Sequence, residues 1–144
     1  MRSGSQASSP HTSAREKTPE DPVRVIVADD QAVFRDVARD VLGELPEFEL
    51  IAEAASGREA LELAVELKPD LVLLDVRMPD IDGIETATRL SEIVPSSVVV
   101  LISVEEPRDV PAARSCGAAT FVRKQDFGPA LLRRIWRAFA QPAS

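Results

Sequence analysis

Four apolar segments of this chain each end in a polar or charged residue. The segments are residues 23–28, 71–74, 98–102 and 118–122, and the side chains at or just after their ends are Asp29 and Asp30, Asp75, Ser103 and Lys124. Short apolar segments bounded by such residues are typical of strands buried on both faces of a parallel sheet. Because open α/β sheets bind ligands at the carboxyl ends of their strands, we expect these side chains to converge.

Three carboxylates at one edge of a sheet repel one another and raise each other's pKa. A hard divalent cation relieves this repulsion, and Mg²⁺ needs only one or two protein carboxylates beside a phosphate. The residues therefore predict a Mg²⁺-assisted phosphoryl site in which one aspartate is the nucleophile. Ser103 can donate a hydrogen bond to an acyl phosphate, and Lys124 can pair with its charge. A simpler alternative is that Asp29 and Asp30 only cap the helix that follows them.

Over about residues 23–140, the sequence resembles the receiver domains of two-component response regulators. The residues that carry the resemblance are Asp75, Ser103 and Lys124 in this order and spacing, the string Val76-Arg77-Met78-Pro79, and Asp82-Gly83. The likeness is greatest to the branch whose members often carry a C-terminal helix-turn-helix. It implies a flavodoxin-like, doubly wound α/β fold, with five parallel strands in the order 2-1-3-4-5 and five helices.

The resemblance also implies a role for each residue of the acidic site. Asp75 is implied to be the phosphoacceptor, and Asp29 and Asp30 to be the acidic pair that organises Mg²⁺. The metal would also be bound by Asp75 and by the backbone carbonyl of Arg77. Lys124 is implied to pair with the phosphoryl group.

Three further positions concern switching and access. By resemblance, Ser103 is the hydroxyl switch and Phe121 is the aromatic switch. Val104 departs from the family pattern, in which the residue after the switch hydroxyl is usually Ala or Gly. Since valine is branched at Cβ and stiff at χ1, we expect Val104 to restrict access to the site.

The elements that must position these residues alternate between strand and helix signals, which indicates βαβ units. We predict strands over residues 23–28, 48–54, 70–75, 97–103 and 118–122. We predict helices over residues 31–44, 57–67, 83–93, 109–116 and 128–140. The fourth helix is expected to be short and to begin near Asp109, because Pro107 and Pro111 would each remove a hydrogen bond from a longer helix and clash with its preceding turn.

The chain has 144 residues, a length that suits one domain. Residues 1–22 are rich in Ser, Pro, Thr and Gly, so we expect a disordered N-terminal tail, a receiver domain over residues 23–140 and a C-terminal tail over residues 141–144. No apolar segment approaches the length that spans a membrane, and no signal peptide is evident. The single cysteine, Cys116, fits a reducing cytoplasm.

The charge is −7 overall, but residues 23–126 carry 11 Lys and Arg against 21 Asp and Glu. Such an acidic body argues against direct binding of nucleic acid and favours a divalent cation. The expected partners are a histidine kinase or phosphotransfer protein, and a downstream protein or second copy bound to the face formed by residues 109–140. The sequence leaves open the cognate kinase, the output partner, the oligomeric state and any domain after Ser144.

Three functions are compatible with these residues. The first is a phosphorylation switch that modifies itself and is therefore no turnover enzyme. The second is a degenerate receiver that acts as a constitutive docking module. The third is a phosphatase or transferase with an aspartyl nucleophile, but those enzymes usually have an Asp-x-Asp pair, and the residue two positions after Asp75 is Arg77.

Overall fold

The computed structural model of the protein describes residues 21–140, so the predicted tails at 1–22 and 141–144 lie outside the described residues, apart from Asp21 and Pro22. A five-stranded parallel sheet with the strand order β2-β1-β3-β4-β5 forms its centre. The strands are β1 (Val23–Ala28), β2 (Phe48–Ala54), β3 (Leu71–Asp75), β4 (Val98–Ser103) and β5 (Thr120–Arg123). The predicted flavodoxin-like sheet and its strand order are confirmed.

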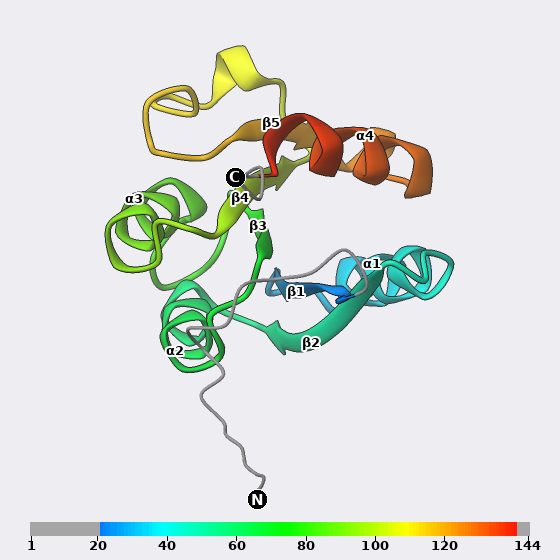
Figure 1. Ribbon diagram of the computed structural model, residues 1–144. Helices are drawn as coiled ribbons and strands as arrows, with labels where there is room; N and C mark the ends of the chain where they lie inside the picture. Colours follow the sequence, from blue (N-terminus) through cyan, green and yellow to red (C-terminus); the bar gives the residue numbers. More distant parts are fainter. Residues whose placement is uncertain (1–20, 141–144) are drawn as a thin grey trace, which may run out of the picture.

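Within residues 21–140, four α-helices cover the sheet, one fewer than predicted. They are α1 (Ala32–Gly43), α2 (Gly57–Leu67), α3 (Gly83–Ile93) and α4 (Pro129–Phe139), with short 3-10 helices η3 (Pro107–Asp109) and η4 (Lys124–Asp126). Figure 1 looks along the sheet and shows α1 and α4 on one face and α2 and α3 on the other. None of the helices within residues 21–140 combines the length and apolarity needed to span a bilayer.

The central strand β3 shows why its sequence is continuously apolar. Leu71 and Leu73 lie in the apolar cluster beneath α1 and α4, whereas Val72 and Leu74 lie in the cluster beneath α2 and α3. Because successive side chains of a strand point to opposite faces, both sets of alternate residues must be apolar. Both faces of β3 are therefore buried, and the charge of Asp75 comes only at the strand's last residue.

The predicted helix over residues 109–116 is wrong. In its place the chain forms η3 and a series of turns, the yellow loop of Figure 1. A residue that precedes proline avoids the helical region, and Val110, which precedes Pro111, is extended at φ −120° and ψ 98°. Ala112 then adopts a positive φ of 67°, which no α-helix contains. Pro107 itself starts η3, where its missing N–H costs nothing.

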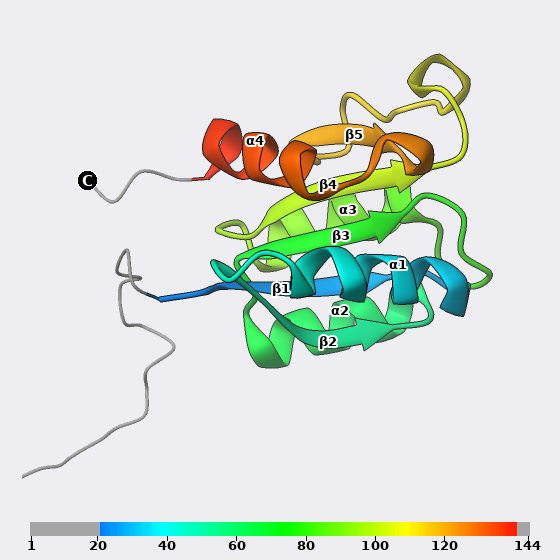
Figure 2. The same cartoon turned by 90° about the vertical axis from the view of Figure 1, so that its right-hand side faces the viewer.

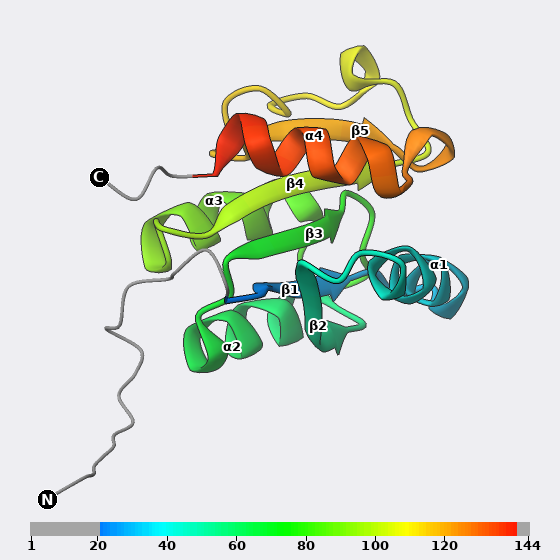
Figure 3. The same ribbon diagram turned by 45° about the vertical axis from the view of Figure 1, so that its right-hand side comes forward.

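All other predicted elements are present, with ends that differ by at most two residues. The largest difference is the start of β5, which lies at Thr120 rather than at residue 118. Gly117, with φ of 97°, completes the turns that precede this strand. Figures 2 and 3 show the five strands running in one direction, so their carboxyl ends lie at the same edge of the sheet.

Candidate functional site

The carboxyl edge of the sheet brings the predicted acidic residues together. Asp29 and Asp30 directly follow β1, and Asp75 is the last residue of the neighbouring strand β3. Each of the three carboxylates offers an oxygen within 4.8 Å of the others. The convergence expected from the strand ends is therefore present in the structure.

Asp29 is fully buried and is not a simple helix cap. Its Oδ1 accepts a hydrogen bond of 2.8 Å from the backbone N–H of Gln31, which is the N-cap residue of α1. Its Oδ2 makes no hydrogen bond of good geometry within the described part of the chain, and it faces Nζ of Lys124 at 2.7 Å. Neither Asp29 nor the exposed Asp30 occupies the capping position, so the capping alternative does not account for the pair.

Asp75 lies in an electrostatic environment that disfavours its charged form. Burial, followed by the negative charge of Asp29, raises its pKa from 3.8 to about 7. Lys124 and a backbone hydrogen bond from Arg77 lower the pKa but do not offset these effects, and Asp30 raises it further. A carboxylate under such repulsion is one that a bound cation would stabilise.

The donor set of this site fits Mg²⁺. Asp29, Asp30 and Asp75 present only carboxylate oxygens, the ligands that a hard cation prefers. Two of the three carboxylates are buried, and the only partner of Asp29 Oδ2 within residues 21–140 is the Lys124 ammonium, so the cluster keeps an excess of negative charge. The backbone carbonyl of Arg77, on the loop after β3, is the further oxygen implied by the resemblance.

Lys124 reaches the acidic cluster from the far side of the sheet edge. It is the first residue of η4, directly after β5, and its side chain is largely buried. Nζ lies 2.7 Å from Asp29 Oδ2 and 3.7 Å from Asp75 Oδ1. One ammonium group therefore pairs with two carboxylates that come from two different strands.

Ser103, the buried last residue of β4, has its hydroxyl engaged by Glu105. Ser103 Oγ accepts a hydrogen bond of 3.0 Å from the backbone N–H of Glu105 and donates one of 3.4 Å to its Oε1. Arg77 in turn donates to both carboxylate oxygens of Glu105, each at 2.8 Å. The pKa of Glu105 is lowered chiefly by this bidentate pair.

Glu105 was missed by the sequence analysis, although the register of the sheet contains a signal for it. Asp75 pairs with Ile102 between β3 and β4, so the residues that follow the two strands lie side by side. Arg77 and Glu105 stand in these two loops with opposite charges. A second ion pair, between Arg123 and Glu106, holds the same loop from the side of β5.

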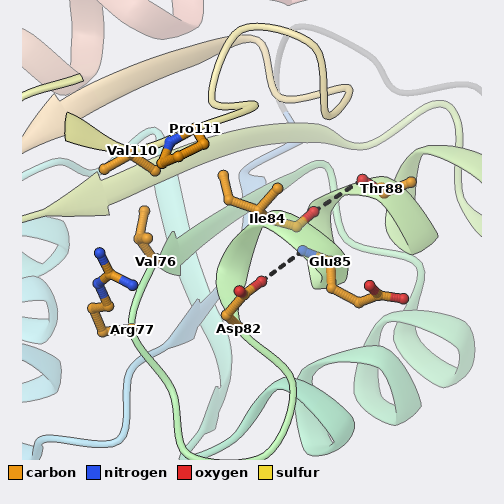
Figure 4. Close-up of a pocket in the computed structure, with 8 residues that line it drawn as sticks. All are labelled: Val76, Arg77, Asp82, Ile84, Glu85, Thr88, Val110 and Pro111. Atoms are coloured by element: carbon orange, nitrogen blue, oxygen red, sulfur yellow. Dashed lines mark hydrogen bonds between the residues drawn. The ribbon is translucent and has the colours of Figure 1, made fainter. Parts of the chain in front are cut away.

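The loop that replaces the fourth helix borders a pocket beside the site. The pocket has a volume of about 320 Å³ and its lining residues are Val76, Arg77, Asp82, Ile84, Glu85, Thr88, Val110 and Pro111. Figure 4 shows Val110 and Pro111 facing Ile84 across this space. Asp82 caps α3 by accepting a hydrogen bond of 2.9 Å from the backbone N–H of Glu85.

Comparison with known proteins identifies the family. Residues 25–136 match the response regulator receiver domain family. This chain belongs to that family. Phosphorylation and Mg²⁺ dependence are characteristic of receiver domains in two-component signalling.

The relatives of this receiver include both longer proteins and separate receiver domains. The protein-glutamate methylesterase/protein-glutamine glutaminase of Geobacillus kaustophilus is 42% identical over 104 residues, which cover 71% of this chain and 30% of that protein. The signal receiver domain of NarL from Mycobacterium tuberculosis is 36% identical, with a TM-score of 0.72 and coverage of 80% of this chain and 97% of that chain. A chain of the CheX-CheY-BeF3-Mg complex of Borrelia burgdorferi is 27% identical, with a TM-score of 0.74 and coverage of 84% and 92%.

The receiver spans about a third of the length of the methylesterase relatives that it matches, at 30% to 37%. The matches therefore cover only a minor part of each of these longer proteins. With the two solved chains above, the receiver shares its fold.

The two remaining predicted residues flank the site of the receiver. Phe121, on β5, is partly buried and packs against the apolar cluster beneath α2 and α3. Val104, directly after Ser103, is 73% exposed.

Proposed function

We propose that this receiver is a phosphorylation-controlled switch and that Asp75 is its phosphoacceptor. The phosphoryl donor is a histidine kinase or a phosphotransfer protein. The observation that carries the proposal is the placement of the Lys124 ammonium 2.7 Å from Asp29 and 3.7 Å from Asp75, beside Asp30. A cation fixed between carboxylates in this way is prepared to pair with an incoming phosphoryl group.

In the proposed reaction an Oδ of Asp75 attacks the phosphorus atom of the donor. The bond between phosphorus and the donor breaks, the leaving group keeps the electron pair, and an acyl phosphate remains on Asp75. Lys124 favours the attacking carboxylate, because its charge lowers the pKa of Asp75 against the effect of burial. Mg²⁺ held by Asp29, Asp30, Asp75 and the carbonyl of Arg77 would offset the negative charge on the reacting oxygens.

Phosphorylation would then act through Ser103 and Phe121. The acyl phosphate adds charge and acceptor oxygens, to which the Ser103 hydroxyl can donate once it leaves Glu105. Movement of Ser103 makes room for Phe121 to turn inward from its partly buried position. The face formed by residues 109–140 would change its affinity for partners as a result.

We assign the receiver domain to residues 23–140, with tails at residues 1–22 and 141–144, and place it in the cytoplasm. Its output is a downstream protein or a second copy of the chain bound to the 109–140 face, rather than nucleic acid. The excess of acidic residues over residues 23–126 supports this assignment. The methylesterase relative favours an enzyme as the effector, whereas the likeness to the branch with a C-terminal helix-turn-helix favours a DNA-binding effector.

Intact mass measurement after incubation with acetyl phosphate and Mg²⁺ tests the proposed function. The wild type should gain the mass of one phosphoryl group, and Asp75→Ala should gain none. No gain by the wild type would favour a docking module, and continuous phosphate release without an accumulated adduct would favour an aspartyl phosphatase. Mg²⁺ affinity should fall in the Asp29→Asn, Asp30→Asn double variant but not in Asp40→Asn, which alters an exposed acid of α1.

A further inference from the structure

The ammonium group of Lys124 has a third neighbour besides the two carboxylates. Its Nζ lies 4.9 Å from the centroid of the Phe34 ring, within the distance of about 6 Å at which a ring face attracts a cation. Phe34 is a buried residue of α1, one turn after the acidic pair. The helix that follows the acidic pair therefore places an aromatic ring next to Lys124, the lysine that pairs with Asp29.

A second ring supports the first. The centroids of Phe34 and Phe127 lie 5.4 Å apart with an angle of 57° between the ring planes, a favourable tilted arrangement. Phe127 directly follows η4, the short helix whose first residue is Lys124. Lys124 and Phe127 therefore come from one short turn, and the Phe34 ring of α1 contacts both of them.

A lysine side chain needs such restraint to act at one place. It has a flexible four-carbon stem, and its freely rotating ammonium carries no preferred direction of its own. The ammonium lies 1 Å nearer to the Asp29 oxygen, at 2.7 Å, than to the Asp75 oxygen, at 3.7 Å, so the carboxylates alone draw it toward Asp29 more strongly than toward Asp75. The buried Phe34 ring attracts the ammonium from a second surface, which is uncharged and is held in place by packing.

We propose that Phe34 is a positioning residue that holds the Lys124 ammonium beside Asp75, with Phe127 as its support. This inference rests on the proposed phosphorylation of Asp75 and extends it to residues outside the acidic site. An aliphatic residue at position 34 would keep this part of the core apolar but would remove the ring. The ring is required because only an aromatic face offers negative potential to the ammonium.

The test compares Phe34→Leu with the matched control Phe48→Leu. Both residues are buried phenylalanines of the same apolar cluster, and Phe48 also pairs with a ring, that of Trp136, at 6.4 Å. Phe48 begins β2 and so lies at the amino edge of the sheet, opposite the site. Variants of the 144-residue chain are first compared by urea unfolding, and Phe34→Met replaces Phe34→Leu if the latter does not fold.

The first measurement is the rate of phosphorylation by acetyl phosphate at saturating Mg²⁺. Phe34→Leu should lower the rate by about 2- to 30-fold, the range expected for loss of a cation–π contact. Phe48→Leu should leave the rate within about twofold of wild type, as expected for a packing change remote from the site. Equal effects of the two variants would overturn the proposal.

Two further measurements separate positioning from packing. In a Lys124→Met background, Phe34→Leu should cause no additional loss of rate, because the ring acts through the lysine. The NMR resonances of the Lys124 Cε–Hε group should lose their ring-current shift in Phe34→Leu and keep it in Phe48→Leu. A Lys124 resonance that does not move in Phe34→Leu would refute the positioning role. This measurement needs no phosphodonor, so its result is separate from a failure of the wild type to be phosphorylated, which would refute the proposed function.

Discussion

Replacing Asp75 by asparagine tests the electrostatics of the site without any phosphodonor. In the metal-free protein, burial and the charge of Asp29 raise the pKa of Asp75 from 3.8 to about 7. Between pH 3.8 and about pH 7, the Asp75 side chain is therefore protonated in the folded state and ionised in the unfolded state. It follows that this group's contribution to stability is full below about pH 4 and is lost as the pH rises through about 7.

The size of the effect follows from the difference between the two pKa values. A difference of about three corresponds to about 4 kcal/mol of unfolding free energy, which is an upper limit because the site can relax. Asparagine has the same shape as aspartate but carries no charge. The Asp75→Asn variant should therefore resemble the wild type near pH 4 and exceed its stability by a few kcal/mol near pH 9.

Urea unfolding in the presence of a chelator, followed by the fluorescence of Trp136, measures this difference across the pH range. The exposed Asp40→Asn variant serves as the control and should follow the wild type. Added Mg²⁺ should stabilise the wild type more than Asp75→Asn, because a ligand stabilises only the state that binds it. The same pH dependence of stability in Asp75→Asn and the wild type, or a lower stability of the variant near pH 9, would contradict a raised pKa of Asp75.

Three further substitutions have defined outcomes. The pKa of Asp80 is lowered to about 2, chiefly by a hydrogen bond from the Arg58 backbone. The stability advantage of the wild type over Asp80→Asn should therefore shrink as the pH falls from about 4 to about 2. A difference in unfolding free energy that stays constant over this range in urea unfolding would contradict the prediction. Gly83→Ala should cost about 1–3 kcal/mol in the same assay, because its methyl group would meet the carbonyl oxygen of Asp75, whereas Gly43→Ala, with nothing within 4 Å, should be tolerated. Val104→Ala should speed both phosphorylation by acetyl phosphate and loss of the acyl phosphate, and unchanged rates would show that Val104 does not restrict access.

The sheet and the acidic cluster were predictable because both follow from the strands. Strands buried on two faces must be apolar throughout, so β3 and β4 stand out in the sequence. Parallel strands end at one edge, which places Asp75 near Asp29 without any knowledge of side-chain packing. The resemblance to receivers added the order of the strands.

The segment after β4 was not predictable to the same extent. The sequence indicates that Pro107 and Pro111 limit a helix, but it does not reveal that Ala112 takes a positive φ. That conformation is unfavourable for alanine, so the residue type at this position gives no indication of it. The predicted fourth helix was wrong for this reason.

Contacts between side chains of segments far apart in the sequence were not predictable either. The pair of Arg77 and Glu105 depends on the register between β3 and β4, and the contact of Phe34 with Lys124 depends on how α1 lies against η4. In the sequence, Phe34 is only an apolar residue at a helical position. Its placement beside the ammonium is determined by packing, which apolar periodicity alone does not specify.

The most direct test of the central claim is chemical mapping of the phosphorylated residue. Treatment with acetyl phosphate and Mg²⁺, followed by borohydride reduction of the acyl phosphate and mass analysis of the peptides, identifies the modified aspartate. We expect the modification at Asp75 in the wild type and at no position in Asp75→Ala. Modification at Asp29 or Asp30, or an unmodified wild type, would contradict the assignment of Asp75 as the phosphoacceptor.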